Sequence, residues 1–154
     1  MLNATKDVTG DVTRVTLKGE IDESVNLLTL LGEPVPKMHF VLKEVNRINS
    51  MGVKAWLTYV KICLDKGTQM VLSECSPVIV EQLNLISNFA PANSVVSLYA
   101  PFSCEECNSE FVALYQAADV KARKVNLEKT KCPGCGGAAE LDDSPEMFFA
   151  FLGN

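Results

Sequence analysis

The sequence predicts an α/β fold, with a mostly parallel sheet and packed helices, followed by a small cysteine-rich module. Up to about Ala100, short β-branched apolar runs alternate with segments that have an apolar helical face. This alternation favours a parallel sheet covered by helices. Beyond Pro101 the composition changes to two C-x-x-C pairs, Gly-rich turns and a charged stretch. We therefore expect residues 1–100 to form the α/β domain and residues 101–154 to form the module.

The strands and helices of the first part follow in order along the chain. Its strands have β-branched, alternating or wholly apolar runs, and we expect them at residues 12–17, 39–42, 69–72 and 94–99. Its helices have apolar faces between capping residues, and we expect them at residues 25–31, 53–66 and 77–86. Gly32 and Gly67 end the first two helices, and Pro77 occupies the first position of the third.

Composition and charge exclude several classes of protein. The 154 residues have room for one domain plus a module, and their net charge is -5. An acidic chain is a poor partner for nucleic acid or an anionic membrane. Met1 is not followed by a basic stretch and an apolar run, and no apolar stretch reaches the length of a membrane span. We therefore expect a cytoplasmic protein without membrane contact.

Four of the six cysteines form two C-x-x-C pairs, which are the strongest chemical signal in the sequence. In a reducing compartment such pairs indicate metal binding rather than disulfides. Two residues between thiolates let both sulfurs reach one ion, and Gly136 and Gly137 let the backbone fold back toward the sulfurs. A closed four-sulfur shell suits one structural zinc ion. The predicted ligands are Cys104, Cys107, Cys132 and Cys135.

The 24 residues between the pairs have the length of a β-hairpin, so the module is predicted to be a zinc ribbon. We expect its hairpin strands at residues 110–115 and 124–127. Two other interpretations of the cysteines stay open, namely two redox dithiol pairs or an iron centre, because four sulfurs also bind iron. From Cys104 to Asn154 there are nine acidic and five basic residues, so the basic stretch at 121–131 is interpreted as a solvated hairpin face.

The end of the chain is too apolar to remain in water. Ser144 and Pro145 predict the start of a short terminal helix. Phe148, Phe149 and Phe151 follow, and we expect them to dock on the ribbon or on the sheet. A homodimer contact is the alternative.

Three short motifs give the first part a family resemblance. They are Gly19-Glu20-Ile21-Asp22, Ile48-Asn49-Ser50-Met51-Gly52-Val53 and Cys75-Ser76-Pro77. Over residues 8–100 this ordered set resembles the STAS domain, a family that includes bacterial anti-sigma-factor antagonists. A STAS-like domain fused to a C-terminal zinc ribbon also looks like an architecture of bacterial regulatory proteins.

The resemblance implies a site at the second motif. In the antagonists this motif reads Asp-Ser-x-Gly, and its serine, Ser50 here, is phosphorylated by a partner Ser/Thr kinase that is also the anti-sigma factor. The resemblance implies that the unphosphorylated protein binds this partner and the phosphorylated protein releases it. The surface facing the partner would consist of Asn49, Ser50, Met51 and Gly52. Asn49 stands where the family has aspartate, which keeps the shape and capping ability of the side chain but loses its charge.

Other interpretations of this turn stay open. Either Asn49 or Ser50 can cap the helix, so Ser50 can be a cap that never carries phosphate. The protein would then be a phosphate-independent scaffold or a dimer. A ribbon that contacts nucleic acid is the third alternative.

The sequence contains no set of residues that enzymes use. His39 is the only histidine and has no nucleophile near it in sequence, so we expect a structural role. Glu20 and Asp22 fit a turn and a helix cap, whereas Cys63 and Cys75 fit buried core positions. Neither a Gly-rich phosphate loop nor a Ser-His-Asp set is present. We therefore predict a regulatory protein rather than an enzyme.

Overall fold

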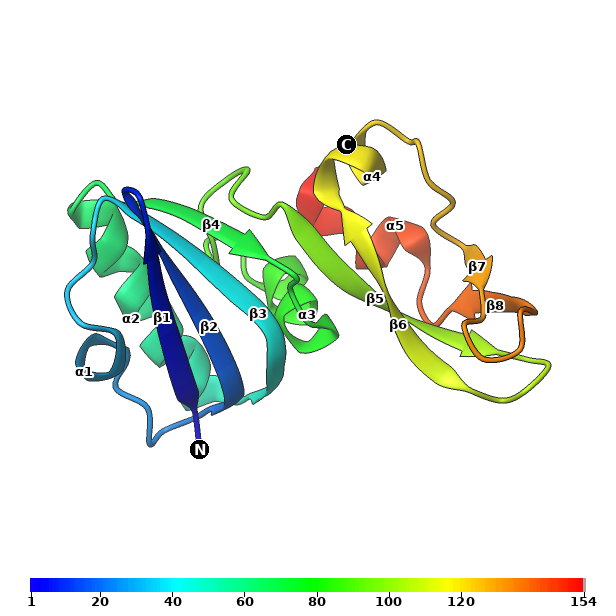
Figure 1. Cartoon of the computed structure of the whole chain (residues 1–154), viewed down its shortest axis with the longest axis horizontal. Helices are drawn as coiled ribbons and strands as arrows, with labels where there is room; N and C mark the ends of the chain where they lie inside the picture. The colour runs from blue at the N-terminus through cyan, green and yellow to red at the C-terminus, as the bar shows by residue number, and fades with distance from the viewer. Residues whose placement is uncertain (154) are drawn as a thin grey trace.

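A four-stranded sheet forms the first part of the molecule. The computed structural model describes residues 1–153. The strands of this sheet are, in spatial order, β1 (Asn3–Thr9), β2 (Val12–Ile21), β3 (Lys37–Ile48) and β4 (Gln69–Ser73). β1 pairs antiparallel with β2, whereas β2, β3 and β4 are parallel (Figure 1). The sheet is therefore mixed and mostly parallel, as the alternation of strand and helix patterns predicts.

Three helices accompany this sheet, namely α1 (Leu27–Leu31), α2 (Ser50–Asp65) and α3 (Pro77–Leu85). In Figure 1, α2 lies behind the sheet, whose front face carries no helix. Phe40 of β3 meets the ring of Trp56 edge-on, with 5.4 Å between centroids, and Trp56 stacks on Phe89 at 5.6 Å. The Trp56 Nε1–H also donates to the Phe89 carbonyl oxygen at 2.8 Å, so the one polar atom of this buried ring has a partner.

One strand links the two parts of the molecule. β5 (Ser97–Cys104) begins beside β4, where the Cys75 N–H donates to the Ser97 carbonyl at 3.1 Å and the Tyr99 N–H donates to the Cys75 carbonyl at 2.8 Å. The strand then continues into a second sheet and ends at Cys104. The domain boundary expected near Ala100 falls within this strand and stays a prediction.

The second sheet is antiparallel and has the order β6-β5-β8-β7. Its other strands are β6 (Glu110–Gln116), β7 (Lys129–Lys131) and β8 (Ala138–Leu141). The short helix α4 (Ala117–Lys121) follows β6, and α5 (Pro145–Phe148) and a 3-10 turn, η1 (Ala150–Leu152), close the described chain. The fold is thus a mixed α/β sheet joined to a separate antiparallel sheet that carries the cysteine pairs.

An aromatic cluster forms the small core of the second part. Phe102 stacks with Phe111 at 5.8 Å and with Tyr115 at 6.2 Å between centroids. Phe149 packs edge-on against Tyr115 at 5.5 Å and against Phe148 at 5.1 Å. Because Phe148 and Phe149 are buried here, the predicted docking of the terminal segment on the ribbon is confirmed.

The terminal segment is also held by the first part. The Asn84 side chain on α3 donates to the Phe148 carbonyl at 2.9 Å and accepts from the Phe151 N–H at 2.8 Å. The side-chain amide of Asn84 thus joins α3 to both α5 and η1. As predicted, Ser144 precedes the start of α5, and its hydroxyl caps the helix by accepting from the Met147 N–H at 3.3 Å.

Two expectations about strands need correction. The return strand predicted at residues 124–127 is wrong, because these residues form a loop and β6 pairs with β5 instead. The loop is positioned by the Tyr115 hydroxyl, which donates to the Asn126 carbonyl at 3.0 Å, and Leu127 packs against the core. Leu127 is therefore apolar because it packs on the core rather than because it belongs to a strand, whereas Val125 is exposed. In addition, the sequence patterns missed β1 and gave only a third of β3, which has 12 residues.

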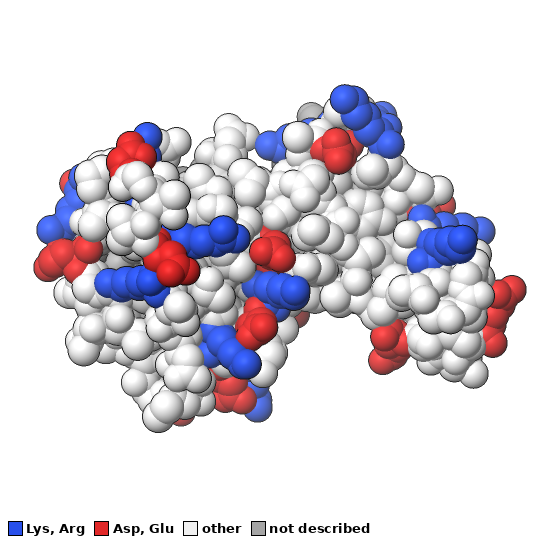
Figure 2. All heavy atoms as spheres, viewed as in Figure 1, with Lys and Arg blue, Asp and Glu red and all other residues white. Residues whose placement is uncertain are grey.

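The described residues 1–153 contain no helix that is long and apolar enough to cross a membrane. Charges of both signs are interspersed over the first sheet in the view of Figure 2. The middle of this face, where β5 and β6 lie, is largely free of charged side chains.

Candidate functional site

The four paired cysteines meet at the end of the second sheet. Their sulfurs all lie within 4.8 Å of one another, although 24 residues separate the two pairs. Cys104 Sγ is 3.5 Å from Cys135 Sγ, and Cys107 Sγ is 3.7 Å from Cys132 Sγ. Cys104 and Cys132 are buried, whereas Cys107 and Cys135 are exposed. The four thiols can therefore serve as the ligands of one metal ion.

The first cysteine turn is closed by two backbone hydrogen bonds. The Asn108 N–H donates to the Cys104 carbonyl at 2.9 Å, and the Cys104 N–H donates to the Ser109 carbonyl at 2.9 Å. Asn108 adopts a left-handed φ of 60°, which asparagine tolerates better than most residues. The Ser109 hydroxyl lies 2.9 Å from Cys107 Sγ. Hydrogen bonding by this hydroxyl and by the Ser109 backbone lowers the pKa of Cys107 to about 6, which favours its thiolate. The pKa of Cys135 moves the opposite way, to about 12: the Gly137 N–H lowers it, but contacts with the Cys104 and Cys107 thiols raise it by more.

The second cysteine turn repeats this arrangement. The Gly136 N–H donates to the Cys132 carbonyl at 2.9 Å, and the Cys132 N–H donates to the Gly137 carbonyl at 2.8 Å. Gly136 has a left-handed φ of 78°, at the position that Asn108 takes in the first turn. The Gly137 N–H donates to Cys135 Sγ at 3.4 Å. The two glycines thus fold the backbone toward the sulfur, as their position after the cysteines predicts.

The geometry and chemistry of this cluster fit zinc. A tetrahedral zinc site with Zn–S bonds of about 2.3 Å needs sulfurs about 3.8 Å apart. The separations of 3.5 Å and 3.7 Å lie close to this value. Four thiolates also complete the shell without an open position for water, which is typical of a structural metal rather than a catalytic one.

The second motif forms the start of α2, where Asn49 is the N-cap. Its side-chain oxygen accepts from the Gly52 N–H at 2.8 Å, and its backbone carbonyl accepts from the Val53 N–H at 2.8 Å. Of the two caps that the sequence allows, the structure uses Asn49. Ser50 is therefore the first residue of the helix, and it is exposed.

Gly52 is buried because the start of α2 lies directly against the end of β2. A Cβ atom at this position would collide with the carbonyl oxygen of Ile21. The same carbonyl accepts from the Asn49 N–H at 3.2 Å. Of the four residues predicted to face a partner, Asn49, Ser50 and Met51 are exposed, and Gly52 is packed inside. Gly52 shapes the turn, whereas the other three offer contact area.

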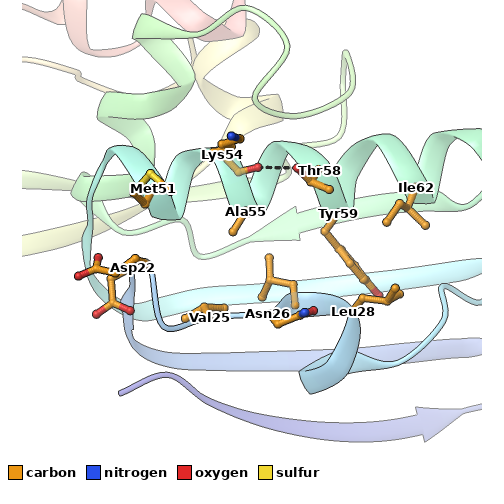
Figure 3. Close-up of a pocket in the computed structure, with 12 residues that line it drawn as sticks. Asp22, Val25, Asn26, Leu28, Met51, Lys54, Ala55, Thr58, Tyr59 and Ile62 are labelled. Atoms are coloured by element: carbon orange, nitrogen blue, oxygen red, sulfur yellow. Dashed lines mark hydrogen bonds between the residues drawn. The ribbon is translucent and has the colours of Figure 1, made fainter.

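A groove of about 400 Å³ lies beside this turn, between α1 and α2 (Figure 3). Asp22 and Met51 lie at the same end of it, next to the motif, and Ile62 lies toward the other end. The residues that line it are Asp22, Glu23, Val25, Asn26, Leu27, Leu28, Met51, Lys54, Ala55, Thr58, Tyr59 and Ile62. Its walls are thus mainly apolar, with charged side chains near the motif.

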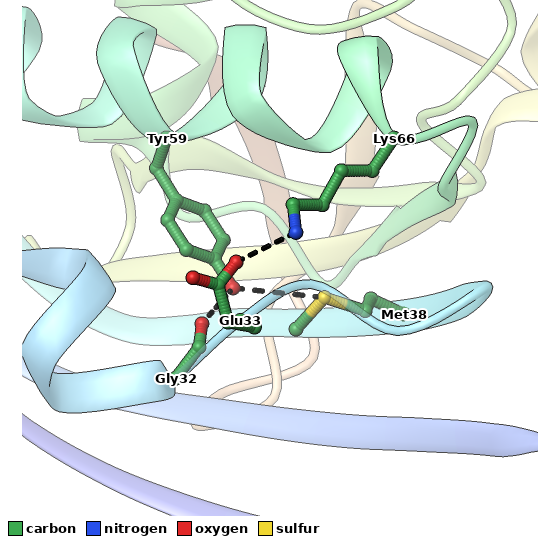
Figure 4. A network of polar contacts seen from close by, with 5 residues as sticks. All are labelled: Gly32, Glu33, Met38, Tyr59 and Lys66. Atoms are coloured by element: carbon green, nitrogen blue, oxygen red, sulfur yellow. Dashed lines mark hydrogen bonds and ion pairs between the residues drawn. The ribbon is translucent and has the colours of Figure 1, made fainter.

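Tyr59 fixes α2 to the segment that leaves α1 (Figure 4). Its hydroxyl donates to the Gly32 carbonyl at 3.2 Å and lies 3.7 Å from the Met38 sulfur. Burial raises the pKa of Tyr59, so the hydroxyl stays protonated and remains a donor. Beside it, Lys66 and Glu33 form an exposed ion pair at 2.8 Å. These contacts set the distance between the two walls of the groove.

A carboxylate is held beside the cap of α2. The Asn49 amide donates to Glu23 Oε2 at 2.8 Å, and this hydrogen bond lowers the pKa of Glu23. An ionised aspartate at position 49 could not donate and would face Glu23 with a like charge. Glu23 therefore accepts a hydrogen bond that the Asn49 amide can donate and that the aspartate of the family motif could not. This contact joins residues 26 positions apart, so no local pattern signals it.

The remaining candidates have structural roles. His39 Nε2 lies 2.7 Å from the Ser73 hydroxyl, across the neighbouring strands β3 and β4. Burial lowers the pKa of His39, and the contact satisfies two polar side chains on the sheet. Cys63 and Cys75 are buried, as expected, and burial raises the pKa of their thiols to about 11 and about 12.

Comparison with known proteins concerns the fold. No family model matches this sequence, and no curated protein matches it. One similar solved structure is a sulfate transporter family protein from Wolinella succinogenes, with 21% identity and a TM-score of 0.47 over 58% of this chain and 80% of that chain. Another is the anti-sigma factor antagonist SpoIIAA in its unphosphorylated form, with 18% identity and a TM-score of 0.40 over 57% of this chain and 84% of that chain.

At these identities and TM-scores, neither neighbour carries information about function. The first part of the chain is a mixed, mostly parallel sheet with packed helices, and its second part has a four-cysteine cluster consistent with a zinc ribbon. Both agree with the resemblance that the sequence motifs carry.

Proposed function

We propose that this protein is a cytoplasmic regulatory module of the anti-sigma-factor-antagonist type, which binds a protein partner and catalyses no reaction. The partner would be an anti-sigma factor or a related Ser/Thr kinase. It would dock on Asn49, Ser50, Met51 and the adjoining groove. The observation that carries this proposal is the place of Ser50, exposed at the first position of a 16-residue helix and next to an apolar groove.

Phosphorylation of Ser50 would act as a local electrostatic switch. A phosphate at the start of α2 meets free backbone N–H groups and the positive end of the helix dipole, so the domain can accept it without unfolding. Lys54 follows one turn later on the same helix face and could pair with it. A partner that packs apolar side chains over the groove would then have to remove water from about two added negative charges beside Asp22 and Glu23, and this cost disfavours docking.

The unmodified surface favours a partner segment with apolar side chains. Met51, Ala55 and Ile62 offer apolar contact along α2. Asp22 and Glu23 offer negative charge at the end near Ser50. The carboxylate that the family motif has at position 49 would be supplied by Glu23, which the Asn49 amide holds in place.

We further propose that Cys104, Cys107, Cys132 and Cys135 hold one structural zinc ion. Zinc would supply a rigid crosslink between the two cysteine turns. The matched hydrogen bonds of these turns and the sulfur separations support zinc over two redox dithiol pairs. An iron centre is the remaining alternative, and metal analysis of untagged protein distinguishes the two.

A pulldown from the native cytoplasm tests the switch. Wild type and Ser50→Ala should retrieve a kinase-like ATPase, and Ser50→Asp should lose it. Ser144→Asp is the matched control, because Ser144 is an exposed serine at the start of another helix. Retention of the same partner by Ser50→Asp would instead indicate a phosphate-independent scaffold, and loss of it in Ser144→Asp would show that charge alone disturbs the protein.

A further inference from the structure

The outer strands of the two sheets differ in how their free edges are protected. β1 carries Lys6 and Asp7, and β7 has only three residues, two of which are lysines. Proteins use such charges and short lengths to keep edge strands from pairing with other chains. β6 has seven residues, and after Glu110 it contains neither a charge nor a proline. β4, the other outer strand of the first sheet, also lacks charges, but its edge is bridged by Val95 and Leu98 of the segment that leads into the second sheet. β6 is therefore the outer strand that lacks these protections.

The hydrogen bonds between β5 and β6 show which backbone groups of β6 face outward. At one end of this hairpin the Cys104 N–H donates to the Ser109 carbonyl at 2.9 Å, and at the other the Ala117 N–H donates to the Val96 carbonyl at 2.9 Å. Because antiparallel pairing alternates with a period of two, the odd-numbered residues of β6 bond to β5. The residues that turn their N–H and C=O groups away are Glu110, Val112, Leu114 and Gln116, and all four are exposed.

Apolar side chains accompany this free edge. Val112 and Leu114 are 49% and 47% exposed. Across the hairpin they lie opposite Pro101 and Tyr99. Figure 2 shows a largely uncharged surface over this part of the molecule. An edge with free backbone groups and exposed apolar side chains is a template for pairing with another strand.

We propose that β6 is the interface of a homodimer, in which two copies pair antiparallel about a two-fold axis through Ala113. In this alignment Val112 lies opposite Leu114 of the second copy, and Glu110 lies opposite Gln116. Every outward-facing residue of one strand then meets an outward-facing residue of the other. No like charges oppose each other, so the strand is complementary to itself.

The charges at the two ends of β6 favour a second copy of this chain as the partner, and they favour antiparallel over parallel pairing. The acidic residues of the turn before the strand are Glu105 and Glu106. After the strand, α4 and the residues that follow it contain Lys121, Arg123 and Lys124 and one acidic residue, Asp119, so this end carries a net positive charge. An antiparallel dimer brings the acidic start of each strand to the basic end of the other, whereas a parallel dimer would bring like charges together.

This interface does not rest on the proposed function. The Asn49 turn belongs to the first sheet and its helices, whereas β6 is the outer strand of the second sheet. A dimer through β6 would therefore leave both Asn49 turns available.

Sedimentation equilibrium of the full chain over a wide range of concentrations tests this proposal. The wild-type mass should rise with concentration from the monomer value of 16.8 kDa toward twice that value. Leu114→Lys and Val112→Pro should both remain at the monomer mass with an unchanged circular dichroism spectrum. The lysine adds a charge to the edge, and the proline removes an outward N–H without disturbing the ladder to β5.

Val8→Lys is the matched control, because Val8 is a 74% exposed apolar residue on the edge strand β1. It should dimerise like wild type. Three results would overturn the proposal: a wild type that stays monomeric throughout, a dimer that survives Leu114→Lys, or a dimer that Val8→Lys abolishes. If Val112→Pro unfolds the module, the surface substitution Leu114→Lys alone decides.

Discussion

The first sheet and the cysteine module maintain their structures by different means. In the first part Trp56 is enclosed between Phe40 and Phe89, within an apolar core that continues along β5 into the second part. The second part has a smaller aromatic cluster and four clustered thiols. Small units bury too little apolar surface to be stable alone, and a metal commonly compensates. The two parts should therefore fail for different reasons, the first through lost packing and the second through lost metal.

Removing two of the thiols should have the largest effect. The double variant Cys104→Ser, Cys132→Ser should lose zinc, whose binding contributes about 10–16 kcal/mol in small zinc-dependent folds. The near-ultraviolet circular dichroism of the aromatic cluster around Tyr115 should collapse with it. Metal analysis of untagged protein measures the first effect, and Cys63→Ala is the control that should retain zinc. Zinc retained by the double variant, or absent from wild type, would contradict the assignment of the site.

A smaller but still large effect is expected for Phe89→Ala. Loss of the ring that stacks on Trp56 should lower the free energy of unfolding by about 3–5 kcal/mol. Because Trp56 is the only tryptophan, its fluorescence during urea unfolding reports on the first part alone. The zinc content should stay unchanged. A Phe89→Ala protein that also loses its metal would show that the two parts are not separable in this way.

The smallest of the three effects is expected within the cysteine turns, whose equivalent positions can be compared with each other. Gly136→Ala should weaken zinc binding by about 1–2 kcal/mol, because an L-residue is strained at its φ of 78°. The added Cβ would meet only the end of the Lys131 side chain at 3.5 Å, so the cost lies in the backbone. Asn108→Gly, at the equivalent position, should bind zinc as well as wild type. Competition with a chelator measures both, and equal losses would contradict the equivalence of the turns.

The parts of the fold that sequence reasoning could predict have one buried face. The side chains of β2 alternate and those of β4 are mostly apolar because these strands pack on helices, and such patterns can be read from a short stretch of sequence. β1 was not predictable, because six of its seven residues are exposed and leave no hydrophobic period. The reverse error arose at residues 124–127, where Leu127 is apolar because it packs on the core from a loop.

The candidate sites divide in the same manner. The cysteine cluster could be predicted because each C-x-x-C pair can be recognised from four consecutive residues. The local sequence also predicted a cap of α2 at Asn49 or Ser50, but it did not decide between the two. The groove between α1 and α2 and the contact of Asn49 with Glu23 could not be predicted, since they depend on how distant segments pack.

The position of Cys104 at the end of β5 has a consequence for folding. Successive side chains on a strand point to opposite faces, so a slip of β5 by one residue against its neighbours would turn the Cys104 thiol away from the other three. Such a misaligned chain could not complete a four-thiolate shell. Metal binding would therefore favour the correct alignment of the strands. Only chains whose strands are correctly paired can bind the ion, and binding stabilises those chains early in folding.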